Sequence, residues 1–588
     1  MFDNISENNT VQTYIPIQEI HHTHDKFEAA VERAKDLFLD KWIINQTLSG
    51  KDSGAASICV VEGFRRAKLI DPTVGPLYVV TTNTTIENIE LHDYMMTLHQ
   101  DMVEYGKSEG LEIISAELKP SLSSRPLVEL VGRGKLIYTP QTTSTGRACA
   151  ISWKISPMEA FIKSIERQYQ TKKVLNITGS RGSESAVRAA NLLKRNESAF
   201  NVTKTDLGFV MPIIMDWSLN DVWSLFTIVD NGDIDSYSDN FDSMIKHYSA
   251  ANNGVCDLFA GNSKKLDKNC GSRFGCSLCS MNNIEEDSLL NQIDIDDKTY
   301  GYMRPLTELR KYLNDTLFDY QYRSKIGSKI TDGFLKVGPN QYSLTYRQNL
   351  LRYILTIQNE SYAHGGPEIQ LIDFEELVAI QYHWTRCGFE EESGSAFKIW
   401  HEICELDEGN YPIPATTRVA QSALPEYMYF DIESHMGNAD AIGLDDVGFD
   451  GEYRHLAMQY RKDGESNRVI KFTENCSFTV VTKDALAMDF VTDFYPQMLA
   501  DGLLVNQCPT TMMKLMLECG LIEISKGSIA RLNEEIKRAQ TFIRLKELSA
   551  VSIETIVNSL SVSAAIKDNI VAERKLAKSS NNQQASFF

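Results

Sequence analysis

The sequence predicts an α/β protein whose first part forms a doubly wound parallel sheet. Short apolar runs alternate with longer amphipathic stretches, and turns that contain glycine or other small residues separate them. Strands that alternate with helices in this way usually form a parallel sheet with helices on its faces. Apolar residues make up 43% of the 588 positions, which is enough for a large core and argues against a disordered or fibrous protein.

Four apolar runs are predicted strands, and amphipathic stretches long enough for helices follow three of them. Parallel sheets of this kind bind ligands beyond the carboxyl ends of their strands. We therefore expect the loops at residues 49–53 and 178–184 to face one crevice. The predicted strands are residues 42–48, 77–81, 112–118 and 173–178, and the predicted helices are residues 53–70, 86–106 and 183–194.

Changes in pattern divide the chain into five segments. Between residues 240 and 287 the periodicity is lost and Gly, Asn, Ser and Cys are frequent, which indicates an irregular insertion organised by a bound metal. We expect a polar leader at residues 1–25, the sheet domain at residues 26–239, the cysteine-rich insertion at residues 240–290, a helical domain with a basic patch at residues 291–405, and a helical and mixed C-terminal region at residues 406–588.

Charge and apolar run length limit the functional classes. With 59 Lys and Arg against 79 Asp and Glu, the formal charge is −20, which excludes a generally basic protein that coats nucleic acid. No apolar run reaches the ~18 residues that span a bilayer, and the first ten residues lack a basic flank followed by an apolar stretch. We therefore expect a cytoplasmic protein that does not bind membranes.

The loop after the first predicted strand has the composition of a phosphate-binding loop. Residues 47–53, Thr-Leu-Ser-Gly-Lys-Asp-Ser, lie before a helix, where unpaired backbone N–H groups and the helix dipole favour phosphate. Lys51 adds a positive charge, but Asp52 follows it, so the Walker A pattern is not met. The alternative is an ordinary helix start with Asp52 and Ser53 near the N-cap.

The loop after the fourth predicted strand carries two arginines. Residues 179–188 read Gly-Ser-Arg-Gly-Ser-Glu-Ser-Ala-Val-Arg. Arg181 and Arg188 offer forked donors to phosphate, and Glu184 can orient one of them. The alternative is an exposed i,i+4 pair between Glu184 and Arg188, worth only ~0.3 kcal/mol.

Four cysteines form a candidate metal site. Cys256, Cys270, Cys276 and Cys279 fall within 24 positions, and four thiolates so close together indicate zinc or an iron–sulfur cluster. Only one short C-x2-C pair is present, which weakens the zinc interpretation without excluding it, so spacing alone does not choose the metal. Cys149 lies apart from this group and is either a thiolate that handles sulfur or a small buried residue.

Residues 304–352 form a locally basic stretch, with nine Lys and Arg against four acidic residues and with tyrosines interleaved. Such a stretch could hold phosphates and stack bases, and a solvated helix face explains it equally well. The interleaved tyrosines include Tyr320, Tyr322, Tyr342 and Tyr346.

Together these motifs resemble the DndC/SspD-type DNA phosphorothioation proteins, in which a phosphoadenosine phosphosulfate (PAPS) reductase-like ATP pyrophosphatase domain carries an iron–sulfur cluster. Residues 48–53 resemble the pyrophosphate loop S-G-G-x-D-S of that superfamily, and residues 179–188 fit its G-x-R-x-x-E-S-x-x-R pattern. Residues 270–279 resemble the family's C-G-x-S-R-F-G-C-W-x-C, with Ser277 in place of Trp. The resemblance covers roughly residues 30–385.

The resemblance implies an adenine nucleotide alpha-hydrolase-like fold and an enzyme that activates a DNA backbone phosphate by adenylylation, so that sulfur replaces a non-bridging oxygen. It implies ATP, Mg²⁺ and a [4Fe–4S] cluster on the four clustered cysteines, with Zn²⁺ as the alternative metal. The implied partners are DNA, a cysteine desulfurase that donates sulfur, and other proteins of a bacterial defence system based on phosphorothioation. The implied cofactor-binding residues are Ser49, Gly50, Lys51, Asp52, Ser53, Gly179, Arg181 and Glu184, and the implied catalytic residues are Lys51, Asp52, Arg181 and Arg188.

Two other functions fit the same motifs. The acceptor could be a tRNA base, which would make the protein a tRNA thiolase, because the motifs do not identify the acceptor. The chain could also be a non-catalytic subunit of a defence complex that senses nucleotides, since Leu48, Ser49 and Asn83 differ from the family's residues at their positions.

Overall fold

The computed structural model describes most of the chain, which forms two compact units. Unit 1 contains Met1–Pro120 and Arg147–Arg304, and unit 2 contains Ser121–Gly146 and Pro305–Phe588. None of the described helices is both long enough and apolar enough to cross a membrane. The described residues are 17–143, 148–184, 186–206, 208–239, 241–251, 274–281, 288–363, 369–422, 424–436, 478–480, 484–505, 507–524, 528–549 and 552–585.

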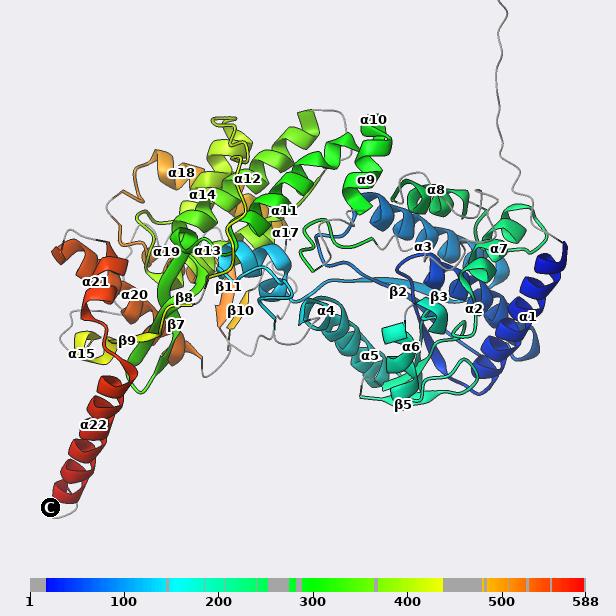
Figure 1. Cartoon of the computed structure of the whole chain (residues 1–588), viewed down its shortest axis with the longest axis horizontal. Helices are drawn as coiled ribbons and strands as arrows, with labels where there is room; N and C mark the ends of the chain where they lie inside the picture. The colour runs from blue at the N-terminus through cyan, green and yellow to red at the C-terminus, as the bar shows by residue number, and fades with distance from the viewer. Residues whose placement is uncertain are drawn as a thin grey trace, which may run out of the picture. The chain divides into compact units, whose positions relative to one another are not determined.

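Six strands in the described part of unit 1 form one sheet, which confirms the predicted α/β class (Figure 1). The strands are β1 (Ile43–Thr47), β2 (Leu77–Thr82), β3 (Ile113–Leu118), β4 (Val174–Ile177), β5 (Thr203–Thr205) and β6 (Gly208–Met211). Their order is β3-β2-β1-β4-β6-β5, and all neighbours are parallel except β5 and β6. The four predicted strands are therefore present, and their ends agree within one residue.

Helices alternate with these strands. The predicted helices at residues 53–70, 86–106 and 183–194 correspond to α2, α3 and α6, and α1 begins inside the segment that we expected to be a polar leader. The main helices of unit 1 are α1 (Ile17–Leu39), α2 (Lys51–Ile70), α3 (Ile89–Glu109), α5 (Ser156–Gln168), α6 (Ala186–Lys194), α7 (Leu219–Asp230), α8 (Phe241–Ala251) and α9 (Ser288–Ile295).

Alternate residues of each strand supply two separate cores. Ile44 and Ile177 pack into a large core with α1, α2, α3, α7 and α8. Ile43 and Val174 pack instead into a second core that includes Ile162 of α5. Because neighbouring side chains of a strand point to opposite faces, both faces of the central strands are buried under helices, as in a doubly wound sheet.

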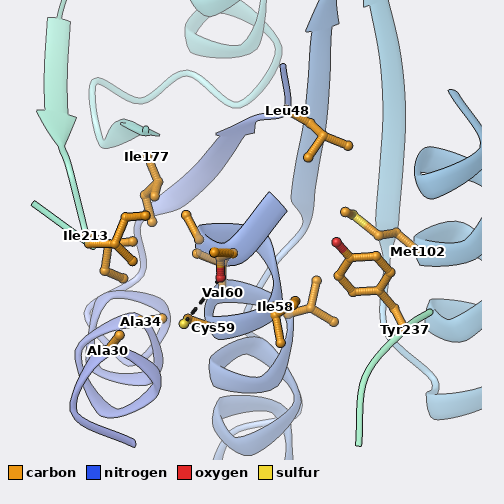
Figure 2. Close-up of a cluster of buried hydrophobic side chains, with 14 of the residues drawn as sticks. Ala30, Ala34, Leu48, Ile58, Cys59, Val60, Met102, Ile177, Ile213 and Tyr237 are labelled. Atoms are coloured by element: carbon orange, nitrogen blue, oxygen red, sulfur yellow. Dashed lines mark hydrogen bonds between the residues drawn. The ribbon is translucent and has the colours of Figure 1, made fainter. Parts of the chain in front are cut away.

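Helices α1 and α2 pack against each other in the large core. Figure 2 shows Ala30 and Ala34 of α1 beside Cys59 of α2, and these small side chains let the two helices approach closely. Gly63 of α2 lies directly against α1 in this contact. A Cβ added to Gly63 would lie 2.6 Å from Ala34 Cβ and 2.9 Å from the backbone nitrogen of Lys35.

Unit 2 combines helices with a three-stranded antiparallel sheet of order β7-β8-β9, in which β7 is Arg323–Thr331, β8 is Phe334–Tyr342 and β9 is Met428–Asp431. A separate two-stranded antiparallel sheet pairs β10 (Phe478–Val480) with β11 (Ile522–Ile524). The main helices are α11 (Arg304–Asp315), α12 (Leu344–Ala363), α13 (Phe374–Cys387), α14 (Ser395–Trp400), α15 (Ile432–Met436), α17 (Asp484–Asp489), α18 (Tyr495–Ala500), α19 (Thr511–Glu518), α20 (Ile529–Ser549), α21 (Ile553–Leu560) and α22 (Ala564–Ala585).

Two features of unit 2 differ from the sequence pattern. The stretch at residues 291–405, expected to be helical, also contains the β7–β8 hairpin. The segment Ser121–Gly146 belongs to unit 2 although it follows the third strand of unit 1 in the chain. It is held there by long-range hydrogen bonds, because Trp384 Nε1 donates to Val131 O at 2.8 Å and Arg347 donates to Gly132 O at 2.7 Å.

Replacing Gly63 with Ala is expected to lower the free energy of unfolding of unit 1 by about 1–3 kcal/mol. Alanine inside a helix normally gains about 1 kcal/mol over glycine, but here the added methyl group would overlap the backbone of α1 and push the helices apart. Chemical denaturation followed by tryptophan fluorescence measures the change. Leu69→Ala on the same helix, where the side chain is 75% exposed, is the control and should change stability by less than ~0.5 kcal/mol. Wild-type stability of Gly63→Ala would contradict the close packing.

Candidate functional site

Parallel pairing brings three loops to one edge of the sheet in unit 1. β1 pairs with β2 on one side and with β4 on the other, so their carboxyl ends lie at the same edge. We call the segments that follow these strands the β1 loop (residues 48–53), the β2 loop (residues 83–88) and the β4 loop (residues 178–184). From β1 the chain continues to β2 on one side, and from β4 it continues toward β6 on the other side, so the strand order reverses between β1 and β4. Sheets of this class usually bind ligands at such a point.

The β1 loop gathers backbone N–H groups around one hydroxyl. The N–H groups of Ser49 and Gly50 donate to Ser53 Oγ at 2.7 and 3.0 Å, and that hydroxyl donates to Gly50 O at 2.9 Å. Helix α2 begins at Lys51, so the positive end of its dipole lies at the same loop. Converging N–H donors at a helix N-terminus are suited to an anionic oxygen.

The β4 loop packs directly against the β1 loop. A Cβ on Gly179 would lie 2.3 Å from Ser53 N and 2.6 Å from Asp52 O, so only glycine permits this contact. Arg181 Nε donates to Asp52 Oδ1 at 2.8 Å, and Arg181 is only 3% exposed. Ser183 Oγ accepts a further hydrogen bond from Arg181 at 2.8 Å. The structure thus joins the two predicted loops through backbone packing and a largely buried ion pair.

Charged side chains of the two loops are arranged around Asp52. Lys51 Nζ lies 3.6 Å from Asp52 Oδ2. The other carboxylate oxygen of Asp52 accepts the hydrogen bond from Arg181. Two cations around one carboxylate leave a net positive charge, which favours an anionic ligand. Arg188 instead forms an i,i+4 ion pair with Glu184, the alternative that the sequence left open.

The predicted insertion at residues 240–290 is not irregular throughout, because it contains helix α8. Its residues 274–281, which we call the cysteine-rich segment, dock on the β2 loop. Ser277 N–H donates to Ile86 O at 2.7 Å, and Ser277 Oγ donates to Glu87 O at 2.8 Å. Because β2 is the neighbour of β1, this segment and the β1 loop lie at the same edge of the sheet.

Cys276 and Cys279 bracket a turn that is closed by a hydrogen bond from Cys279 N–H to Cys276 O at 2.8 Å. Thiolates at C-x2-C spacing on such a turn are a donor set that suits zinc or an iron–sulfur cluster. Cys256 and Cys270, which would complete a site of four cysteines, lie outside the described residues. Within the described residues there is no group of three or more His, Cys, Asp or Glu side chains that could hold a metal ion.

An ion pair lies beside these cysteines, with Lys154 Nζ 2.8 Å from Glu87 Oε1. Burial, together with the negative charge of Glu87, raises the pKa of the Cys276 thiol to about 12. Burial by itself would lower the pKa of Lys154, but attraction to Glu87 and Cys276 raises it overall. Burial also raises the pKa of Cys149, and the nearby thiol of Cys279 adds to the effect. A bound metal cation would therefore be needed to keep Cys276 as a thiolate at neutral pH.

One polar cluster at the same edge was missed by sequence reasoning. Asn83 donates to Glu117 Oε1 at 2.7 Å, and His92 Nε2 lies 3.0 Å from the same oxygen. The hydrogen bond from His92 lowers the pKa of Glu117 to about 2. The carboxylate of this cluster is thus supplied by the neighbouring strand β3. The signal in the sequence was that Asn83 and Glu117 both lie at the carboxyl ends of predicted strands.

The basic stretch at residues 304–352 does not form one exposed face. Arg323 and Arg347 are 4% and 1% exposed, and their guanidinium groups donate to backbone carbonyl oxygens. Tyr342 and Tyr346 are buried and stack on each other, with 4.7 Å between ring centroids. The hypothesis of a nucleic-acid surface is therefore wrong for these four residues, because they fill the interior of unit 2.

Comparison with known proteins assigns no family to the chain. No protein-family model matches it, and no curated protein sequence matches it. The function is therefore inferred from the residues at the sheet edge and from the motifs that they carry.

In the metal-free protein, Cys276 is expected to react with iodoacetamide at least ~100-fold more slowly at about pH 8 than an ordinary exposed thiol. A thiol with a pKa of about 12 is almost fully protonated there, and only the thiolate is nucleophilic. Alkylation at a series of pH values, quantified by peptide mass spectrometry, measures the rate, and the denatured protein is the control. A rate that stops rising near pH 9 in the folded protein would contradict the raised pKa.

Proposed function

We propose that the protein is an ATP pyrophosphatase that activates a DNA backbone phosphate for replacement of a non-bridging oxygen by sulfur, within a bacterial phosphorothioation system. The observation that carries this proposal is the contact between the β1 and β4 loops, where Gly179 packs against Ser53 and Arg181 pairs with Asp52. These loops hold the two nucleotide motifs of the family that the sequence resembles. Their contact supports a single site to which both contribute.

The β1 loop would bind the phosphates of ATP. The N–H groups of Ser49 and Gly50, which now donate to Ser53 Oγ, would donate to phosphate oxygens instead. Lys51 would add a positive charge on the same side of the loop. The net positive charge of the loop region supports this assignment, because a triphosphate must be held against its own negative charge.

The chemistry would take place at the α-phosphate. Arg181 would stabilise the negative charge that develops there, and Asp52 would hold Arg181 in place and help to position Mg²⁺. Arg188 would contribute once its ion pair with Glu184 opens. The bond between the α- and β-phosphates would break, pyrophosphate would leave, and AMP would be transferred to an oxygen of the acceptor phosphate in DNA.

Sulfur would be handled at the cysteine turn. Cys256, Cys270, Cys276 and Cys279 would hold a [4Fe–4S] cluster, with Zn²⁺ as the alternative. Bound there, the cluster would supply iron sites with affinity for sulfur. A cysteine desulfurase would donate the sulfur, and other proteins of the phosphorothioation system would bring the DNA. The docking of residues 274–281 on the β2 loop, at the edge that also holds the β1 loop, supports sulfur chemistry beside the nucleotide.

Lys51→Ala and Asp52→Ala are each expected to lower pyrophosphate release from ATP by about 10²–10³-fold, because each removes a charged group that acts on the transferred phosphates. The assay contains ATP, Mg²⁺, DNA and a persulfide donor. Lys68→Ala, in the last turn of the same helix, is the matched control and should release pyrophosphate at the wild-type rate.

Three outcomes of this assay decide between the alternatives. Undiminished release by both loop variants would contradict the site. Release that needs tRNA in place of DNA would favour the thiolase, and no release by the wild type would favour the nucleotide sensor.

Gly179→Ala is expected to raise the KM for ATP by at least ~10-fold. The added Cβ would overlap the Asp52–Ser53 peptide and force the two loops apart. Gly182→Ala is the control on the same loop, because a Cβ there would meet Met215 O at 3.4 Å, an ordinary contact. Steady-state kinetics of pyrophosphate release measures both variants, and an equal KM for the two would show that the loop contact is not needed to bind ATP.

A further inference from the structure

Tyr248 of α8 lies over the start of α2. Its hydroxyl oxygen accepts a hydrogen bond from Lys51 N–H at 3.3 Å, and its ring centroid lies 4.6 Å from Lys51 Nζ. A Cβ on Gly50 would lie 2.6 Å from the hydroxyl oxygen, so the close approach depends on glycine at that position. The Tyr248 hydroxyl therefore accepts a hydrogen bond from an N–H group at a helix N-terminus. An anionic ligand bound at this terminus would accept a hydrogen bond from the same N–H group.

The same ring contacts the cysteine-rich segment. Phe274 packs edge to face on Tyr248, with 5.1 Å between ring centroids and 90° between ring planes. Phe274 precedes Cys276 by two residues, and Ser277 fixes the following turn to the β2 loop. Trp223 of α7 also packs edge to face on Tyr248, with 5.8 Å between ring centroids. Tyr248 thus touches the β1 loop with its hydroxyl and the cysteine-rich segment with its ring.

We infer that Tyr248 is a positioning residue that couples phosphate binding at the β1 loop to the position of the turn between Cys276 and Cys279. The inference rests on the proposed function only in taking ATP as the ligand of that loop. In this role Tyr248 does not contact the reacting atoms.

The coupling follows from competition for one donor. A phosphate oxygen that accepts from Lys51 N–H must take the place of the Tyr248 hydroxyl, because two acceptors cannot both align with a single N–H in good geometry. The phenol is rigid, so the ring moves with its hydroxyl. The edge-to-face contact with Phe274 depends on ring orientation and is weakened by that movement. The cysteine turn therefore responds to nucleotide binding before any bond is broken.

Hydrogen–deuterium exchange of peptides that cover residues 274–281 tests the coupling. The probe is α,β-methylene ATP with Mg²⁺, which cannot be cleaved between the α- and β-phosphates, and calorimetry on the same samples gives its Kd. In the wild type the probe should raise the exchange rates of the Ser277 and Cys279 amides at least ~3-fold. Tyr248→Phe keeps the ring but lacks the competing hydroxyl, so the probe should bind about 3- to 10-fold more tightly and leave these exchange rates unchanged.

Two further variants complete the test. Tyr248→Leu removes both contacts and should show fast exchange of residues 274–281 with or without the probe. Tyr237→Phe removes a hydroxyl that bonds Ser57 further along α2 and is the matched control, expected to behave as the wild type.

The outcomes separate this inference from the proposed function. If the wild type binds the probe but its exchange does not change, or if Tyr248→Phe shows the same change as the wild type, the coupling is wrong while the nucleotide site stands. If the wild type does not bind the probe, both the proposed function and the coupling fail.

Discussion

The parallel pairing of β1 between β2 and β4 is the constraint on which the site in unit 1 depends. Both faces of β1 are buried, so a shift of one residue in register would turn every side chain of the strand toward the opposite core. Polar contacts reinforce the register below the loops, because Asn45 Nδ2 and Thr47 Oγ1 both bond to Asn176 Oδ1, at 2.9 and 3.0 Å. Only with this register fixed does the backbone of Gly179 meet the peptide of Asp52 and Ser53.

The ion pair between Arg181 and Asp52 has a structural role besides any catalytic one. Arg181 is 3% exposed, and a buried cation without its partner destabilises a fold by several kcal/mol, about 3–5 in known cases. Loss of Asp52 would therefore disturb the loop as well as the chemistry. Lys51, whose ammonium group lies at a greater distance from the carboxylate, is the residue whose removal reports more directly on phosphate binding.

The local sequence pattern was sufficient to predict the strands, helices and loops, but it did not predict the contacts between residues that are distant in sequence. Alternation of apolar runs and amphipathic stretches located β1 to β4 and the helices α2, α3 and α6, and glycine-containing motifs located the β1 and β4 loops. Tyr248 and the pairing of Lys154 with Glu87 could not be found in this way, because the residues in contact are far apart in sequence and follow no periodicity. The charge count over residues 304–352 wrongly placed Arg347 on a phosphate-binding surface. A count of charges does not show that a guanidinium is buried and donates to Gly132 O.

The most direct test of the central claim is mass spectrometry of digested DNA and tRNA from the native host, with either the wild-type gene or Lys51→Ala at its own locus. The account predicts that phosphorothioate dinucleotides disappear from the DNA of the Lys51→Ala strain while every thiolated tRNA nucleoside is kept. Phosphorothioates that persist in that strain, or the loss of a thiolated tRNA nucleoside in their place, would contradict it.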